Sequence, residues 1–282
     1  MNRKKGIYLL ILTSVLWSFA GVCVKFISWN GFAAAGIRGL IAALMILIVS
    51  KRPRLPRSGY QVAAILSYVG LVVLLILSTK LTTAANAILL QYTAPIYSAI
   101  LGYFLLKEPV SRHDVIVIIL VLTGLSIFLY DGLADGRILG NLLALLSGVC
   151  YGAMNVFMRK CDKDAPADNI FWGNLLAFLL TLPFMGHLDL TAVNIGLILF
   201  MGIFQLGLAY ILYAIAIPYV PALEATIITV LEPILNPVWV MLFYGEKPSI
   251  LTIVGGAIVL LAISGKDILA KLRMLFHPFL KS

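Results

Sequence analysis

A carboxylate stands in the middle of a long apolar run near the C-terminus, at Glu232 in the segment 220–244. Keeping an acid charged at bilayer depth is expensive, so an acid at this place is a candidate functional residue. On a helical wheel Thr229, Glu232, Asn236 and Trp239 fall within about 80° of one another, at ~100° per residue. They would form one polar and aromatic stripe. The alternative is a buried acid that stays protonated and hydrogen-bonds a neighbouring helix.

Prolines interrupt this segment and one earlier segment of the chain. Pro233 has no N–H and therefore leaves the Thr229 carbonyl without its helical partner, and Pro237 does the same to the Pro233 carbonyl. Earlier in the chain, Pro95 frees the Gln91 carbonyl in the same way. Broken backbone at bilayer depth is tolerated only where it lines a cavity or is buried in protein. The sequence therefore predicts three helix breaks beside a solute site.

Other charged groups lie inside or at the ends of apolar segments. Glu224 would couple an ion or act in gating, or it is stabilised by the helix dipole and by snorkelling. Arg38 stands ~9 Å deep in the segment 32–50, at 1.5 Å per residue. It could attract an anionic solute, pair with a carboxylate of another helix, or snorkel to the outer headgroups. Lys25 is expected to be a snorkelling anchor, and Glu246 to cap a helix or to pair across a short loop.

Aromatic and amide side chains at mid-depth could present ring faces and hydrogen-bonding groups to an organic solute. Packing explains any one of them better than binding does, but together they favour a small polar organic molecule over a bare ion. Lipid-facing tyrosine normally lies in the interfacial belt, so Tyr92 and Tyr151 rank highest. The predicted solute-binding residues are Trp17, Arg38, Tyr68, Gln91, Tyr92, Tyr151, Asn155, Gln205, Tyr210, Thr229 and Asn236.

The elements that must position these residues are membrane helices. Of the 282 residues 62% are hydrophobic and 12% are charged, whereas a soluble domain carries roughly 25% charged residues. This composition excludes a soluble enzyme and, despite the net charge of +9, a nucleic-acid binder. Crossing ~30 Å of hydrocarbon takes ~20 apolar residues. The ten predicted spans are 7–28, 32–50, 60–79, 82–106, 113–130, 138–158, 168–185, 191–216, 220–244 and 250–265.

The distribution of basic residues predicts the orientation of these spans. Most of the 21 lysines and arginines fall in loops on one side, which is the cytoplasmic side by the positive-inside rule. Both termini are therefore expected in the cytoplasm, with the chain in a plasma (inner) membrane. The first apolar run is too long for a cleaved signal peptide and should be retained. The tail 266–282 reads as an amphipathic helix on the inner leaflet, or else as a frayed basic end.

Matching residues recur at nearly constant offsets along the chain. Pro95 and Pro233 are 138 residues apart, and Lys25 and Arg159 are 134 apart. The chain therefore divides into two five-helix halves, and because five is odd, the second half enters the membrane from the opposite side. Inverted repeats of this kind are typical of transporters with a midplane solute site. The predicted domains are a first repeat 1–134, an inverted repeat 135–265 and the tail 266–282.

The ends of the two halves carry a family resemblance. Pro95 is followed by Leu105-Leu106-Lys107-Glu108-Pro109, and Glu232-Pro233 is followed by Phe243-Tyr244-Gly245-Glu246. Leu16-Trp17-Ser18 and Arg38 fit the same pattern. The chain resembles the drug/metabolite transporter superfamily, in its ten-helix EamA-type branch. The resemblance implies an all-α polytopic membrane protein of ten helices, with solutes that range over amino acids, sugars, nucleotide sugars and other metabolites.

The expected function is secondary active transport, in the export direction, of a small polar organic metabolite such as an amino acid. Alternating access and proton coupling are expected, with Glu232 and Glu224 as coupling residues. The alternatives are an uncoupled facilitator or exchanger, and a lipid-handling or scaffolding membrane subunit. No catalytic constellation, cofactor or metal site is indicated. Expected partners are a small-molecule solute, protons and membrane lipids but no nucleic acid, for a monomer or homodimer.

Overall fold

The computed structural model describes residues 3–50, 53–107, 137–162, 165–216 and 231–258, together with positions 116, 118–120, 123, 124, 127, 219, 228, 229 and 261. All regular secondary structure in these residues is helical. The helices are α1 (Arg3–Ser18), α2 (Ala20–Phe26), α3 (Gly31–Ser50), α4 (Gly59–Leu81), α5 (Ala84–Gln91), α6 (Ala94–Leu106), α8 (Ile138–Lys160), α9 (Ala165–Thr181), η1 (Leu182–Phe184), α10 (Ala192–Phe200), η2 (Met201–Leu208), α11 (Ala209–Ala216) and α13 (Leu231–Tyr244).

Six helical stretches in the described part of the chain are long and apolar enough to cross a membrane. They are Arg3–Phe26, Gly31–Val49, Gly59–Leu81, Ala84–Leu106, Ile138–Lys160 and Ala192–Ala216. Each coincides with a predicted span. Helices α9 and η1 fill the seventh predicted span, and α13 fills most of the ninth. The predicted fifth span and the tail lie largely or wholly outside the described residues. The prediction of an all-helical, polytopic membrane protein is confirmed.

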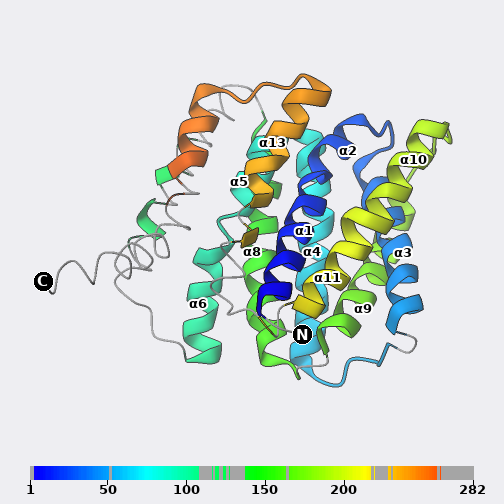
Figure 1. Ribbon diagram of the computed structural model, residues 1–282, viewed down its shortest axis with the longest axis vertical. Helices are drawn as coiled ribbons and strands as arrows, with labels where there is room; N and C mark the ends of the chain where they lie inside the picture. Colours follow the sequence, from blue (N-terminus) through cyan, green and yellow to red (C-terminus); the bar gives the residue numbers. More distant parts are fainter. Residues whose placement is uncertain are drawn as a thin grey trace, which may run out of the picture.

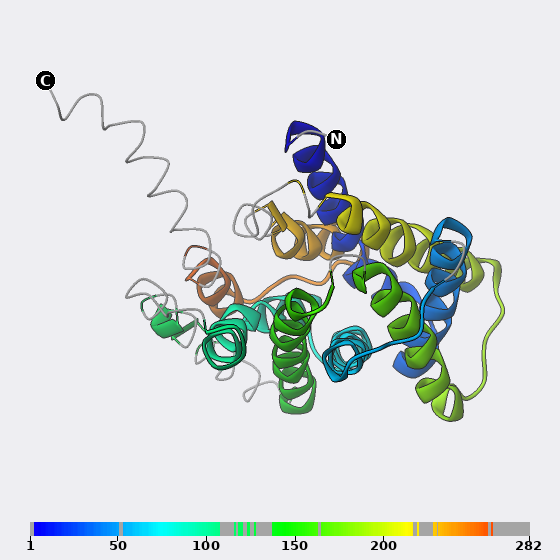
Figure 2. The same ribbon diagram turned by 90° about the horizontal axis from the view of Figure 1, so that it is seen from below.

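Segments from the two ends of the chain pack against one another in this bundle. Helix α1 lies against α11 and α13, and α3 lies against α9. Figure 2 shows α1 beside α11 in the view from below, with α4 near the centre of the bundle. Helix α4 packs along α8, and α8 also packs on α5 and α6. A site in the middle of the bundle is therefore built from both halves of the sequence.

Two glycines in α8 allow that helix to approach the fourth span closely. Gly148 and Gly152 are one turn apart, a spacing that brings small residues to one face. A Cβ on Gly148 would lie 2.9 Å from the carbonyl oxygen of Gln91, and one on Gly152 would lie 2.6 Å from that of Ala94. These carbonyls flank the break between α5 and α6. Larger residues would push α8 away from it.

Irregular helix geometry occurs in several spans. The fourth span breaks at Tyr92 and Thr93, and α6 then begins with Pro95 in its first turn, as the proline predicted. The first span is interrupted at Phe19, and the eighth contains a π-helix, η2; the sequence predicted neither feature. A π-helix is rare and is frequently found at functional sites. The breaks and the π-helix are therefore the places where these spans depart from a regular α-helix.

Lys25 is not the snorkelling anchor that the sequence predicted. Its Nζ lies 2.8 Å from Glu246 Oε2 and donates a hydrogen bond of 2.8 Å to the carbonyl oxygen of Thr82. The prediction was wrong because folding brings a carboxylate and a carbonyl to the end of α2, so that the ammonium is satisfied by protein. Glu246 was expected to cap a helix or to pair across a short loop. It accepts the N–H of Ala84 in the first turn of α5, but its ion pair is with a lysine 221 positions away rather than across a short loop.

Candidate solute site

Tyr92 occupies the break of the fourth span and reaches across to the ninth. Because α5 ends at Gln91, the Tyr92 side chain is released from the helix and points toward α13. Its hydroxyl lies 2.9 Å from the carbonyl oxygen of Thr229 and 3.0 Å from Glu232 Oε2. The Thr229 carbonyl is the one that Pro233 leaves without a helical N–H. A side chain from the first half of the chain thus hydrogen-bonds the opened backbone of the second half.

The number of hydrogen bonds that can form at this contact depends on the protonation of Glu232. A phenol has one hydrogen to donate, and a carbonyl oxygen can only accept. If Tyr92 donates to the Thr229 carbonyl, its contact with Glu232 is a hydrogen bond only when the carboxyl is protonated and donates. If Glu232 is ionised, the Tyr92 hydrogen serves either the carboxylate or the carbonyl. The proton on Glu232 therefore decides which hydrogen bonds form at the broken helix.

Glu232 lies in a buried, aromatic environment. It is 7% exposed, and Tyr92, Tyr151 and Tyr210 are near enough to interact with its charge. The rings of Tyr92 and Tyr151 meet edge to face, with centroids 6.2 Å apart. No lysine, arginine or histidine in the described ranges forms an ion pair with Glu232. An ionised Glu232 would be a buried charge that none of these residues compensates, which is strongly unfavourable.

Arg38 forms a second charged centre, held by neutral groups. Its Nη1 donates to Gln205 Oε1 at 2.9 Å, and its Nη2 donates to the carbonyl oxygen of Val72 at 3.1 Å. Nε has no hydrogen-bond partner, and the side chain is 1% exposed. The snorkelling alternative is therefore wrong, because the side chain is buried in protein. Among the described residues no carboxylate reaches Arg38.

The π-helix η2 positions Gln205 for this contact. Gly202, in the same element, packs against α3 so closely that a Cβ would lie 3.1 Å from the carbonyl oxygen of Arg38 and 2.5 Å from Cβ of Ile41. This close approach brings the eighth span onto the second. The wider turn of the π-helix shifts the following side chains relative to an α-helix. The irregular backbone thus carries the amide that binds the guanidinium.

An aromatic cluster, composed of Trp17, Tyr68, Tyr92, Tyr151, Tyr210 and Tyr213, lies between the two charged centres. Tyr210 is at its middle: its ring centroid is 5.0 Å from that of Trp17 and 5.4 Å from that of Tyr68. Tyr210 also interacts with the charges of both Arg38 and Glu232. The cation and the acid do not form an ion pair with each other. The arrangement places one cation and one acid around a shared set of rings.

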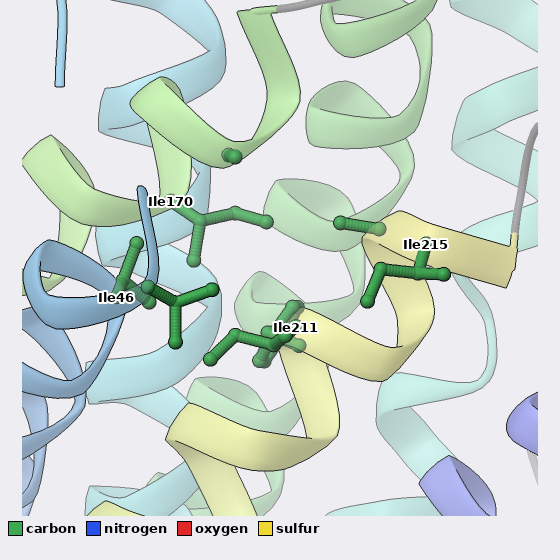
Figure 3. Close-up of a pocket in the computed structure, with 8 residues that line it drawn as sticks. Ile46, Ile170, Ile211 and Ile215 are labelled. Atoms are coloured by element: carbon green, nitrogen blue, oxygen red, sulfur yellow. The ribbon is translucent and has the colours of Figure 1, made fainter. Parts of the chain in front are cut away.

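Tyr210 also forms part of an apolar pocket of about 120 Å³. The other lining side chains come from α3, α9 and α11 and include Ile46, Ile170, Ile211 and Ile215. Figure 3 shows these isoleucines gathered around the pocket from three different helices. An aliphatic group would fit such a lining.

Some predicted site residues lie apart from the aromatic cluster. Gln91 donates from Nε2 to Ser147 Oγ at 2.9 Å, and Ser147 donates to the carbonyl oxygen of Leu71 at 3.0 Å, so Gln91 ties α5 to α8 and α4. Asn155 is half-buried in α8. Asn236 is buried against Gly21, and its Oδ1 has no hydrogen-bond partner.

The remaining predictions have mixed outcomes. Pro233 lies in the first turn of α13, and Pro237 lies inside this helix, which continues to Tyr244. The predicted break at Pro237 is therefore wrong, because a membrane helix surrounded by other helices tolerates a missing N–H without ending. Glu224 lies outside the described residues. Tyr213, whose ring centroid is 5.5 Å from that of Trp17, was missed, although its position one turn after Tyr210 was a usable signal. The described His, Cys, Asp and Glu residues form no group that could hold a metal ion.

Comparisons with known proteins agree with this architecture. A crystal structure of a protein superposes with a TM-score of 0.68 at 17% identity, over 93% of this chain and 98% of that chain, which shows a shared fold. An uncharacterized transporter of Clostridium kluyveri is 26% identical over 89% of each chain. The pseudopaline exporter CntI of Pseudomonas aeruginosa is 23% identical, over 92% of this chain and 94% of its own.

The family assignment covers nearly the whole sequence. Residues 4–130 and 138–265 each match the EamA-like transporter family. The two matched ranges follow one another with a gap of a few residues, and the helices described above fall within them. The chain therefore belongs to the EamA-like transporter family.

Proposed function

We propose that the protein is a secondary active transporter that exports a small polar organic metabolite, such as an amino acid, by alternating access coupled to protons through Glu232. Membership of a transporter family supports the general class. A relative that is named as an exporter supports the outward direction. The proposal includes a plasma-membrane location with both termini in the cytoplasm, and a monomer or homodimer in contact with lipid.

The observation that carries the proposal is the contact of Tyr92 with both Glu232 and the Thr229 carbonyl. When Glu232 is protonated, the Tyr92 hydroxyl can donate a hydrogen bond to the Thr229 carbonyl and at the same time accept one from the Glu232 carboxyl. Loss of the proton breaks one of these bonds beside the first turn of α13. A proton can therefore favour one arrangement of the two halves over another, which is the element that coupled transport requires. Proton entry would then drive solute exit.

The decisive comparison is between the wild-type protein and Glu232→Gln in proteoliposomes. The amide keeps the shape and hydrogen-bonding capacity of the acid but fixes the group in a neutral state. We expect Glu232→Gln to lose pH-driven accumulation and its pH dependence, yet to retain solute counterflow. Asp168→Asn, the same chemical change in the first turn of α9, is the matched control and should behave as wild type.

Each outcome of this comparison assigns a function. Full pH-driven accumulation by Glu232→Gln would exclude coupling at this residue and would leave an uncoupled facilitator or exchanger. Absence of any protein-dependent flux from a whole metabolite extract would contradict transport itself and favour a lipid-handling or scaffolding subunit. Poor folding of Glu232→Leu with normal coupling in Glu232→Gln would indicate a structural acid.

A further inference from the structure

The guanidinium of Arg38 is surrounded by neutral partners only. It carries five N–H donors, and its two hydrogen bonds go to an amide oxygen and a backbone carbonyl oxygen. Within the part of the chain that the structure describes, no carboxylate balances its charge. A buried cation without a counter-charge is costly. If the group served only to link α3, α4 and η2, a neutral amide could make comparable bonds without that cost.

Among the described residues, other buried donors in contact with Tyr210 or Arg38 also lack hydrogen-bond partners. Arg38 Nε and Trp17 Nε1 are both buried and both lack an acceptor. The Trp17 ring packs on Tyr210, which interacts with the charge of Arg38. The buried Tyr68 hydroxyl also makes no hydrogen bond, although the Asn174 amide is close to it. Unused donors beside a cation are complementary to a ligand that only accepts, and an ionised carboxylate is such a ligand.

We propose that Arg38 and Gln205 form an anion subsite, and that the transported solute carries a carboxylate that serves as the counter-ion of Arg38. This inference rests on the proposed transport function and specifies its substrate class. The apolar pocket that shares Tyr210 lies next to this subsite and is lined by four isoleucines. The solute is therefore a carboxylic acid with an aliphatic portion.

The replacement Gln205→Glu tests the proposal with little change in shape. The new carboxylate would take the place of the amide oxygen that Arg38 Nη1 now contacts at 2.9 Å. It would supply the missing counter-charge from within the protein. A purely structural Arg38 would be unaffected or better held, with normal transport. An anion subsite would instead be occupied by the protein itself, so solute carboxylates would be excluded.

The probe is a defined mixture of aliphatic amino acids and their primary amides, including leucine and leucinamide, measured as counterflow in proteoliposomes. We expect the wild type to move acids and not the matching amides. Gln205→Glu and Arg38→Gln should each lose charge-assisted hydrogen bonds to the solute carboxylate. We therefore expect acid counterflow to fall by about 10-fold or more in both variants. Gln61→Glu adds the same charge in the capping box of α4 and should leave acid counterflow unchanged.

The thermal unfolding temperature shows whether each variant is folded, so that a loss of transport can be told apart from misfolding. Gln205→Glu should unfold at or above the wild-type temperature, and leucine should raise the unfolding temperature of the wild type but not of this variant. Equal transport of acids and amides, or normal acid counterflow in a folded Gln205→Glu, would overturn the anion subsite. If the mixture does not move but another solute from a metabolite extract does, this inference fails while the proposed function stands. If no solute moves, the proposed function fails.

Discussion

Lys25 Nζ lies 2.8 Å from Glu246 Oε2, and Oε1 of the same carboxylate accepts the backbone N–H of Ala84 at 2.7 Å. One carboxylate thus joins the end of the first span, the start of α5 and the segment that follows α13. The two side chains are only 13% and 18% exposed, so the pair is largely shielded from solvent. The contact links the first and second halves of the chain at one end of the bundle.

Removal of this carboxylate should destabilise the protein. Glu246→Ala leaves the Ala84 N–H without its acceptor and the Lys25 ammonium with only the Thr82 carbonyl, which we expect to cost about 1–3 kcal/mol. Glu246→Gln retains an acceptor and should lose less. The measurement is the thermal unfolding temperature of the purified variants, with Lys247→Ala as a neighbouring control. An unchanged unfolding temperature in Glu246→Ala would show that the pair contributes nothing to stability.

Pro233 and Tyr92 should act through the same carbonyl. Pro233→Ala supplies an N–H that can bond the Thr229 carbonyl within the helix, and Tyr92→Phe removes the hydroxyl that bonds it now. We expect each change to lower pH-driven uptake by about 10-fold, the equivalent of one lost hydrogen bond of about 1.4 kcal/mol.

The double variant distinguishes a shared mechanism from two separate defects. If both changes act on one carbonyl, the pair should be no worse than the more impaired single variant, since coupled sites are not additive. Tyr103→Phe, at a tyrosine that is 53% exposed on α6, controls for the loss of a hydroxyl. Multiplicative losses in the double variant would contradict the shared carbonyl.

The close approach of α8 to the broken fourth span predicts a strong position dependence for one substitution. Gly152→Ala places a Cβ 2.6 Å from the carbonyl oxygen of Ala94 and should destabilise by about 1–3 kcal/mol. Gly196→Ala meets nothing within 4 Å in α10 and should be neutral or stabilise by up to about 1 kcal/mol. Thermal unfolding of the two variants side by side measures the difference. Equal effects would mean that the helices separate without cost.

The orientation predicted from the basic loops can be measured by cysteine labelling. In a background without Cys23, Cys150 and Cys161, Leu190→Cys should react with an impermeant thiol reagent in intact cells, whereas Ser58→Cys should react only after the membrane is opened. Leu190 is 67% exposed, so access is not limited by burial. Reaction at position 58 alone would place the termini on the opposite side and would contradict the positive-inside assignment.

Local chemistry explains why some site features could be predicted. Thr229, Glu232 and Pro233 lie in one apolar segment, so helix geometry and the missing N–H of proline were enough to predict a polar stripe and a carbonyl without a helical partner. The same reasoning located the break near Pro95. Apolar length likewise gave the spans, because a bilayer imposes ~20 residues per crossing regardless of tertiary contacts.

The bonds that complete the site join residues far apart in the sequence. Tyr92 and Thr229 are separated by 137 positions, and Arg38 and Gln205 by 167. No local sequence pattern could show that the Tyr92 hydroxyl meets the Thr229 carbonyl. For Arg38 the sequence left three alternatives open, because a cation at that depth is satisfied by whatever group another helix brings to it. The tertiary structure brings an amide and a carbonyl.

The sequence by itself determined a helical protein that crosses a membrane many times, with an acid and broken helices at mid-depth. These properties follow from hydropathy, proline chemistry and the cost of buried charge, which act within single segments. Only the tertiary structure decided the π-helix η2, the pairing of Lys25 with Glu246 and the placement of both Tyr92 and Arg38 near Tyr210. The physical reason is that helices from distant parts of the chain pack together, and packing sets which polar groups face one another.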